Sequence, residues 1–177
     1  MLLNSGVVNL DSNIYAVLTG DVVNSEALES YGESLDSVFA LFENNYQEEL
    51  ILEVDRYSGD MFQVLLTNPA NSLRSSLYLF TKLFSMKPSV DIRISIGIGG
   101  IEDVPEERVS TGEGAAFRLS GQNLNGMKRH QRISLKTSND IFGQNLNNLM
   151  RGTMDLLSGL MMDLSIVQAE VTWYKLR

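Results

Sequence analysis

The sequence predicts an α+β domain with a ferredoxin-like order of elements, β-α-β-β-α-β, followed by a third helix, a further strand and a helical C-terminal extension. Three observations predict it. A continuous apolar run at 14–18 indicates a central strand, isoleucines at alternate positions over 92–99 indicate a second long strand, and apolar residues recur at helical spacing in two stretches between them. We expect the helices to pack on one face of the sheet.

The bulk properties of the chain fit one soluble, cytoplasmic domain. It has 177 residues, 44% of them hydrophobic and 20% charged, which is enough to bury a single sizeable core. No apolar run approaches the roughly 20 residues that cross a bilayer, so we expect no membrane partner. The chain has no cysteine, a net charge of −8 and one short basic cluster at 128–132, which argues against binding a nucleic-acid backbone.

The first strand is expected to end in a carboxylate. The apolar run at 14–18 is continuous, as in strands covered on both faces, and it leads into Thr19-Gly20-Asp21. Asn24 and Ser25 are favoured N-cap residues, so an amphipathic helix is expected to begin there and to run through about residue 42.

A hairpin is expected next. Two β-compatible runs, 50–54 and 62–66, flank the sequence Arg-Tyr-Ser-Gly-Asp at 56–60. A glycine at the tight turn suits such a hairpin, which would present Asp60 near its tip.

A second helix is expected from Pro69 to just before Pro88, and then the strand at 92–99. One side of that strand is a row of isoleucines, and the other is almost bare because it carries Gly97 and Gly99. Glycines in a strand often mark the close approach of a ligand or another backbone. We expect this small face to permit close packing between two copies of the chain.

The C-terminal part is expected to form a helix at 114–124, a strand at 132–136 and two more helices, 143–162 and 165–176. Ser165 and Gln168 have the spacing of a capping box, which favours two helices over one. We divide the chain into a domain at 1–140 and a helical segment at 141–177.

The candidate site consists of two Gly-Asp pairs, Gly20-Asp21 and Gly59-Asp60. If the hairpin pairs beside the first strand, both carboxylates meet at one end of the sheet. Mg²⁺ and Mn²⁺ prefer oxygen ligands, and Mg²⁺ commonly binds through one or two carboxylates plus substrate phosphates. The loop at 22–25 adds backbone N–H groups at a helix N-terminus, where phosphates bind readily. Gly-Asp pairs are also common in ordinary turns, which is the structural alternative.

Four motifs carry a resemblance to known families. The segment RYSGDMFQVLL resembles the hairpin of diguanylate cyclases, RISIGIG resembles their later strand, and class III adenylyl cyclases share the preceding aspartate strand. The chain resembles the SatD family of bacterial proteins more closely, through TGDVVNS, SGDMFQVLL, RISIGIGG and GEGAAF, in that order between residues 14 and about 124. The resemblance implies a nucleotidyl-cyclase-type fold with Mg²⁺ or Mn²⁺ held by Asp21, Asp60 and the carbonyl of Val22.

The same resemblance implies which residues contact a nucleotide. They are Gly20, Val22, Val23, Asn24, Ser25, Ser58, Gly59, Arg93 and Arg118. Two departures from active cyclases stand out. Met61 replaces the glutamate of the diguanylate-cyclase signature, and the helix after the glycine-rich strand supplies Arg118 but not the accompanying asparagine. Arg118 has a surface position as its alternative, and Arg93 has an ion pair with Glu53, Asp55 or Asp91.

Two functions remain open. In the first, a SatD-like bacterial regulatory protein binds a nucleotide and a divalent metal as a sensor or dimerisation module, as a homodimer. Family members continue into a DNA-binding helix-turn-helix, which would lie beyond Arg177 and connect the module to transcription. In the second, the chain is an active nucleotidyl cyclase or nucleotidyltransferase that releases pyrophosphate by a two-metal mechanism. Met61 favours the first.

Overall fold

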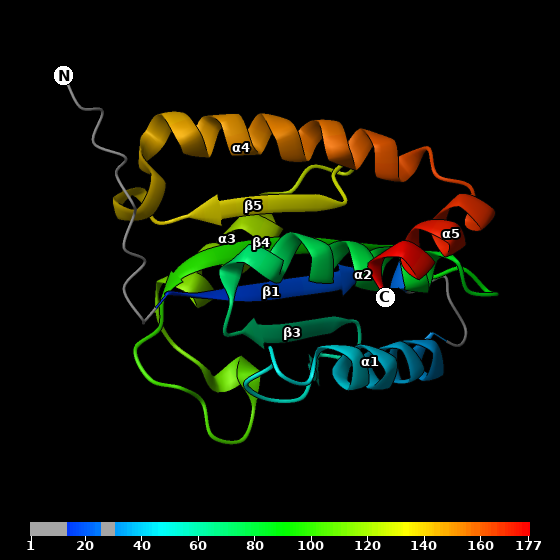
Figure 1. Ribbon diagram of the computed structural model, residues 1–177, viewed down its shortest axis with the longest axis horizontal. Coiled ribbons are helices and arrows are strands. Elements are labelled where there is room, and N and C mark those ends of the chain that lie inside the picture. The colour runs from blue at the N-terminus through cyan, green and yellow to red at the C-terminus, as the bar shows by residue number, and fades with distance from the viewer. Residues whose placement is uncertain (1–13, 26–30) are drawn as a thin grey trace.

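The computed structural model describes residues 14–25 and 31–177, and a five-stranded sheet lies at its centre (Figure 1). The strand order is β2-β3-β1-β4-β5. Neighbouring strands are antiparallel except β4 and β5, which are parallel. The first four strands have the order expected of a ferredoxin-like β-α-β-β-α-β domain, so the predicted α+β class is confirmed. The strands are β1 (Ile14–Val22), β2 (Asp55–Tyr57), β3 (Met61–Leu66), β4 (Ile92–Gly100) and β5 (Ile133–Thr137).

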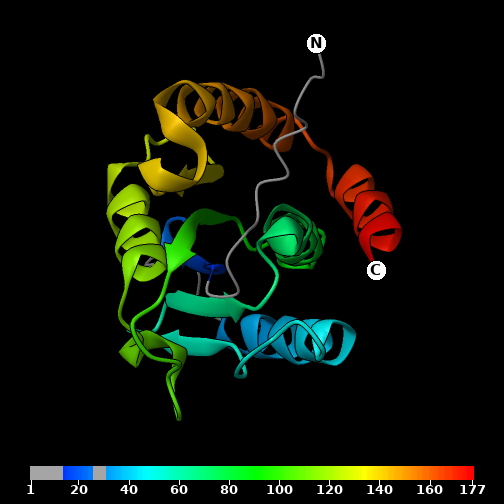
Figure 2. The ribbon, with the colours of Figure 1, turned by 60° about the vertical axis from the view of Figure 1, so that its left-hand side comes forward.

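Helices cover both faces of the sheet, rather than one as the sequence suggested. Helices α1 and α2 pack on one face and α3 on the other, as Figure 2 shows. None of the helices in the described part of the chain is long and apolar enough to cross a membrane. The helices are α1 (Gly32–Tyr46), α2 (Ser72–Phe84), α3 (Ala115–Gly126), α4 (Asn139–Met162) and α5 (Ile166–Leu176), with short 3-10 turns η2 (Pro69–Asn71) and η3 (Val109–Thr111).

The main core lies between the sheet and helices α1 and α2. Alternate residues of β1, β3 and β4 point into it, because successive side chains of a strand face opposite sides. The C-terminal helices contribute Met154, Met161 and Trp173 to this same core, while Val17, Leu65 and η3 form a smaller cluster with α3 on the other face. The division of the chain at residue 140 stays a prediction, but these contacts join its two sides in one core.

The hairpin is shorter on its first strand than expected, because β2 covers 55–57 and not 50–54. Tyr57 pairs with Met61, so the turn has three residues, 58–60, of which Ser58 (φ 52°) and Gly59 (φ 77°) have positive φ. Pairing ends at Val54, whose N–H donates to the Glu43 carboxylate at 2.7 Å instead of to β3. The apolar run at 50–54, which was expected to form this strand, makes one isolated bridge to β3, between Leu50 and Leu66.

Helix α1 begins later than expected, at Gly32, and Tyr31 takes the N-cap position without a side-chain hydrogen bond. Asn24 has a φ of 56° and lies in a turn seven residues or more before the helix, and Ser25 donates its hydroxyl to Asp60. The predicted cap at 24–25 is therefore wrong. The acids expected in the first turn, Glu26 and Glu29, lie outside the described residues.

The two C-terminal helices agree with the sequence. Helix α4 is broken at Gly143 (φ 65°, ψ 170°), so its regular part begins where the sequence indicated. Helix α5 starts after a capping box, in which the Gln168 N–H donates to Ser165 Oγ at 3.3 Å and the Ser165 N–H donates to Gln168 Oε1 at 2.9 Å.

The bare side of β4 is covered by α3. A Cβ added at Gly97 would lie 2.2 Å from the Ala116 carbonyl oxygen and 2.5 Å from the Ser120 nitrogen, and one at Gly99 would lie 3.0 Å from the Ala115 Cβ. The glycines therefore admit another backbone, as predicted, but that backbone belongs to the same chain. The expectation that this face packs against a second copy is wrong.

Candidate functional site

The structure brings the two predicted aspartates to the same end of the sheet. Asp21 is the Cα partner of Met61 in the β1–β3 ladder, so it lies beside the residue that follows Asp60. The Val22 N–H donates to the Asp60 carbonyl at 3.1 Å, which ties the hairpin turn to the end of β1. Ser58 and Gly59 precede Asp60 in that turn, so they place Asp60 through their backbone conformation.

Asp21 is held by an arginine. Arg93, its partner across the β1–β4 ladder, donates from Nε to Asp21 Oδ1 at 2.9 Å and from Nη2 to Asp21 Oδ2. The hydrogen bond to Asp21 raises the pKa of the Arg93 guanidinium. The alternative acids predicted for Arg93 have other partners, since Asp55 pairs with Arg108 and Asp91 with Arg132.

One row of side chains crosses the sheet at this end. Tyr57, Met61, Asp21 and Arg93 occupy matching register positions on β2, β3, β1 and β4, on the face that α3 partly covers. Burial raises the pKa of the Tyr57 hydroxyl, and the negative charges of Asp55 and Asp21 raise it further. The row therefore contains a carboxylate, a guanidinium and a phenol, and the charge of Asp21 raises the pKa of both Arg93 and Tyr57.

The loop after β1 uses its hydrogen-bond donors within the protein, mainly on Asp60, and this leaves fewer of them for a phosphate. Ser25 donates its hydroxyl to Asp60 Oδ2 at 2.9 Å. The Val22 N–H bonds the Asp60 carbonyl and the Val23 N–H bonds the Asp91 carbonyl at 2.8 Å. Two of the backbone donors expected to bind phosphate are thus occupied, because the loop continues the pairing of β1.

A cavity of about 400 Å³ opens beside this end of the sheet, lined by Val22, Val23, Asn24, Arg93, Met127 and Arg129. Arg129 is not among the residues predicted from the sequence, although it belongs to the basic cluster at 128–132. Arg132 of that cluster is fixed by the Asp91 carboxylate and by the Arg129 carbonyl. Within the described residues Arg129 itself has no ion pair, so two guanidinium groups line the cavity. Neither aspartate lines it, but Asp21 is bonded to Arg93, and Asp60 is bonded through its carbonyl to Val22.

Two predicted residues lie elsewhere. Arg118 forms an exposed ion pair with Glu102 at 3.2 Å, near the end of β4 that is opposite to Arg93. Gly20 faces the core, where an added Cβ would lie 2.3 Å from the Phe62 ring. Gly20 therefore makes room for Phe62, and no contact in the structure assigns it to a ligand.

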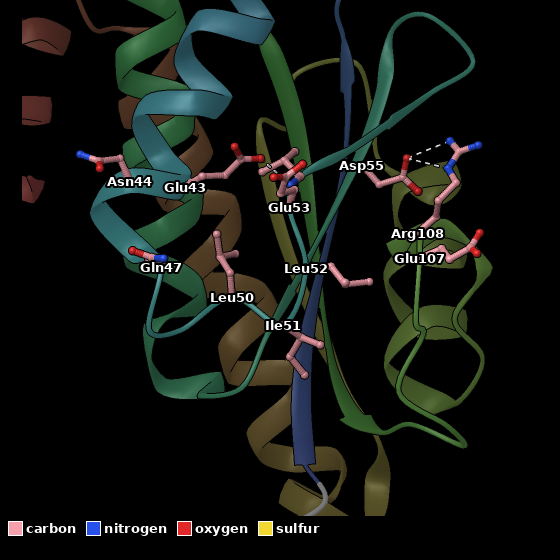
Figure 3. Close-up of a pocket in the computed structure, with 11 residues that line it drawn as sticks. Glu43, Asn44, Gln47, Leu50, Ile51, Leu52, Glu53, Asp55, Glu107 and Arg108 are labelled. Atoms are coloured by element: carbon pink, nitrogen blue, oxygen red, sulfur yellow. Dashed lines mark hydrogen bonds and ion pairs between the residues drawn. The ribbon is translucent and has the colours of Figure 1, made fainter.

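A larger cavity, of about 750 Å³, lies at the β2 side of the sheet and contains none of the predicted residues (Figure 3). Glu43, Glu53, Asp55 and Arg108 line it. Asp55 accepts hydrogen bonds from Arg108 Nη2 at 2.8 Å and from the Ser110 N–H at 2.9 Å. Burial acts to raise the pKa of Asp55, but these bonds and the charge of Arg108 outweigh it, and the net effect lowers the pKa.

The lowered pKa of Asp55 predicts a pH-dependent contribution to stability. A carboxyl whose pKa is lower in the folded state stabilises the fold above its unfolded pKa, about 3.9, and loses this contribution as pH falls through the folded pKa. We expect Asp55→Asn to cost about 1–2 kcal/mol at pH 7 and clearly less near pH 2–3, as measured by urea unfolding. Asp103→Asn, at an exposed carboxylate, is the control; an equal cost of Asp55→Asn at both pH values would contradict the assignment.

The architecture is similar to that of a solved adenylyl cyclase. A bacterial light-regulated adenylyl cyclase superposes with a TM-score of 0.52, over 70% of this chain and 75% of that one, at 13% sequence identity. The chain has the fold of an adenylyl cyclase. The adenylyl cyclase CyaB from P. aeruginosa superposes less well, with a TM-score of 0.45 over 73% of this chain and 79% of that one, at 12% identity.

Sequence comparisons add no narrower relationship. No protein-family model matches the chain, and no curated protein matches it. At 13% identity, the likeness to the light-regulated enzyme establishes the cyclase fold alone. Membership of the SatD family stays a prediction from the four motifs.

Proposed function

We propose that the chain binds a nucleotide together with Mg²⁺ or Mn²⁺ at the Asp21–Asp60 end of the sheet, as the sensing module of a SatD-like bacterial regulatory protein. One observation carries the proposal. Asp21 and Asp60, 39 positions apart by their numbers, lie at one end of a cyclase-type sheet, and a cavity at that end is lined by Arg93, which bonds Asp21, and by Arg129. Carboxylates for a cation and guanidinium groups for phosphates are the two parts that a metal–nucleotide site needs.

The metal would have few protein ligands. No group of three or more His, Cys, Asp or Glu residues gathers in the described part of the chain. The available oxygens are the carboxylates of Asp21 and Asp60 and the carbonyl of Val22, and Mg²⁺ commonly completes such a set with water and substrate phosphates. The residues therefore fit a cation that arrives with a polyphosphate better than a free cation.

Arg93 links the binding of the metal to the binding of the nucleotide. Its guanidinium occupies both oxygens of Asp21, so a cation can use Asp21 only after Arg93 has turned away. A phosphate in the adjoining cavity would accept Arg93 in a charge-assisted hydrogen bond, with Arg129 as a second cation. Nucleotide and metal are thus expected to bind together, each removing an obstacle to the other.

Binding without turnover is the favoured version. Met61 stands where diguanylate cyclases have a glutamate, and Arg118 is at the far end of β4 within the same protomer. The regulatory version includes a homodimer, and DNA binding through a helix-turn-helix beyond Arg177. A nucleotidyl cyclase or nucleotidyltransferase remains the alternative outcome of the experiment below.

The test is thermal unfolding with each of ATP, GTP, CTP and UTP, with cyclic nucleotides, and with Mn²⁺ or Mg²⁺, separately and combined. A hundredfold excess over Kd should stabilise the protein by about 2.7 kcal/mol, and only when nucleotide and metal are both present. Asp60→Asn should abolish that stabilisation, whereas Asp103→Asn should retain it. In Arg93→Gln, Mn²⁺ alone should stabilise the protein relative to that variant without metal, because Asp21 is free.

Chromatography of the same incubations reports turnover. Unchanged nucleotide supports the sensor, and a cyclic or oligonucleotide product that disappears in Asp60→Asn would establish the enzyme instead. Absence of stabilisation with every nucleotide and metal combination would overturn the proposed function in both versions.

A further inference from the structure

Helix α4 exposes leucines on the side that faces away from the core. Leu149, Leu156 and Leu160 are 65%, 76% and 67% exposed, whereas Met154 and Met161 on the opposite side are 2% exposed. Figure 1 shows α4 at the border of the molecule, with β5 on its inner side. The helical period places a set of six residues on this outward stripe. We call it the α4 outer face: Leu149, Gly152, Thr153, Leu156, Gly159 and Leu160.

The two glycines of this face have no explanation within one protomer. A Cβ added at Gly152 or Gly159 would meet nothing within 4 Å, and neither residue has a positive φ. Glycine is the least favourable helix residue after proline, so open positions of this kind normally carry another residue. Glycines beside leucines suit a helix surface that another helix approaches closely, because the distance between packed helices depends on the side chains at the contact.

We infer that the α4 outer face is the contact surface of a homodimer in which two α4 helices pack antiparallel about a two-fold axis. A two-fold interface uses the same patch on both copies, so the patch must complement itself. The spacing along the stripe is symmetric: the intervals between residues 149, 153, 156 and 160 are 4, 3 and 4, the same from either end. An antiparallel pair therefore places Leu149 opposite Leu160 of the second copy and Thr153 opposite Leu156 of the second copy.

The absence of charge on the α4 outer face lets a second copy approach there and not elsewhere. The chain carries a net charge of −8, so two copies repel each other over much of their surface. The α4 outer face has no charged residue, because Arg151 and Asp155 lie on the flanks of the helix. A cationic partner would gain more from the acidic surface elsewhere, whereas an identical copy gains most from this uncharged apolar stripe.

This interface is independent of the proposed nucleotide site. Sheet order places β1, which carries Asp21, two strands from β5, about 10 Å at the usual strand spacing, and the α4 outer face lies on the far side of the helix that packs on β5. A dimer through α4 therefore leaves each Asp21–Asp60 site within its own protomer. The inference adds a contact surface to the homodimer of the proposed function, and its test does not require that the site bind a nucleotide.

Sedimentation velocity over a range of concentrations tests the inference. The full chain should pass from monomer to dimer as concentration rises. Leu156→Glu should raise the dissociation constant at least tenfold, because it places like charges near the two-fold axis. Leu41→Glu, at an exposed leucine of α1, should leave the constant unchanged.

A second variant separates association from folding. Gly159→Ala should raise the melting temperature of the monomer, because alanine favours a helix and the position is open. The same variant should raise the dissociation constant, because the added methyl groups hold the helices apart. A variant that is more stable as a monomer and yet dimerises more weakly cannot be explained by general damage to the fold.

Cysteine variants test the orientation, since the chain has no cysteine of its own. Leu149→Cys mixed with Leu160→Cys should cross-link, whereas Leu149→Cys alone should not, because disulfides need Cα atoms within about 7 Å. A chain that stays monomeric at all concentrations, a dimer that Leu156→Glu leaves intact, or cross-linking of Leu149→Cys to itself would overturn the inference. So would a dimer that appears only when residues 1–13 are removed, since that segment would then be the occupant.

Discussion

Gly97→Ala is expected to destabilise the domain by about 3 kcal/mol, at the upper end of the cost of overpacking a core. The new Cβ would lie 2.2 Å and 2.5 Å from backbone atoms of α3, at Ala116 and Ser120, and neither atom can move without shifting the helix. Helix α3 would have to lift from β4, breaking the Thr19–Ser120 hydroxyl contact at 2.8 Å. Urea unfolding followed by circular dichroism measures the loss.

Gly121→Ala is the matched control, because it adds the same methyl group to the contacting helix. Nothing lies within 4 Å of a Cβ at this position, so the variant should gain up to about 1 kcal/mol from helix propensity. Similar stability changes for the two alanine variants would show that α3 does not pack on Gly97 as described.

Trp173→Ala is expected to cost about 3–5 kcal/mol, the usual range for removing a large buried aromatic side chain. Trp173 joins α5 to the main core. Its ring packs edge-on against Tyr78 at a centroid distance of 6.0 Å, and the Lys82 ammonium lies 3.9 Å from the ring centroid. Arg74 also donates to the Leu176 carbonyl at 2.9 Å, which fixes the end of α5 on α2.

The only tryptophan of the chain also reports the unfolding of α5 in the wild type. Its fluorescence transition in urea should coincide with the transition seen by circular dichroism, because α5 shares the core with the sheet. Tyr174→Ala, next to Trp173 but exposed, should change stability little. An early fluorescence transition, together with an unchanged main transition in Trp173→Ala, would make the C-terminal helices a separate unit.

Local patterns were enough to predict most of the fold. The apolar run of β1, the alternating isoleucines of β4 and the capping box at Ser165 are properties of neighbouring residues, and the structure has all three elements. The start of α1 was missed because Tyr31, whose side chain makes no capping bond, takes the N-cap position, whereas Asn24 and Ser25 are good caps by type but lie ahead of the helix. Local propensity cannot identify a helix start that carries no capping residue.

The candidate site was predicted less completely, because its contacts depend on strand register. The Gly-Asp pairs identified Asp21 and Asp60, and the hairpin implied that they would meet. The bond between Arg93 and Asp21 spans 72 residues and exists only because β4 pairs with β1 in this register. Similarly, the glycines of β4 predicted a close approach, but only the tertiary fold identifies α3 as the element that approaches.

The ion pair between Arg93 and Asp21 has a consequence for what the proposed site would detect. A cation arriving alone meets the positive guanidinium, and a nucleotide arriving alone meets the negative charge of Asp60, so each ligand is opposed by a charge of its own sign. The two together cancel both obstacles. A site built in this way is a coincidence detector, whose occupancy follows the product of the two concentrations rather than the abundance of either.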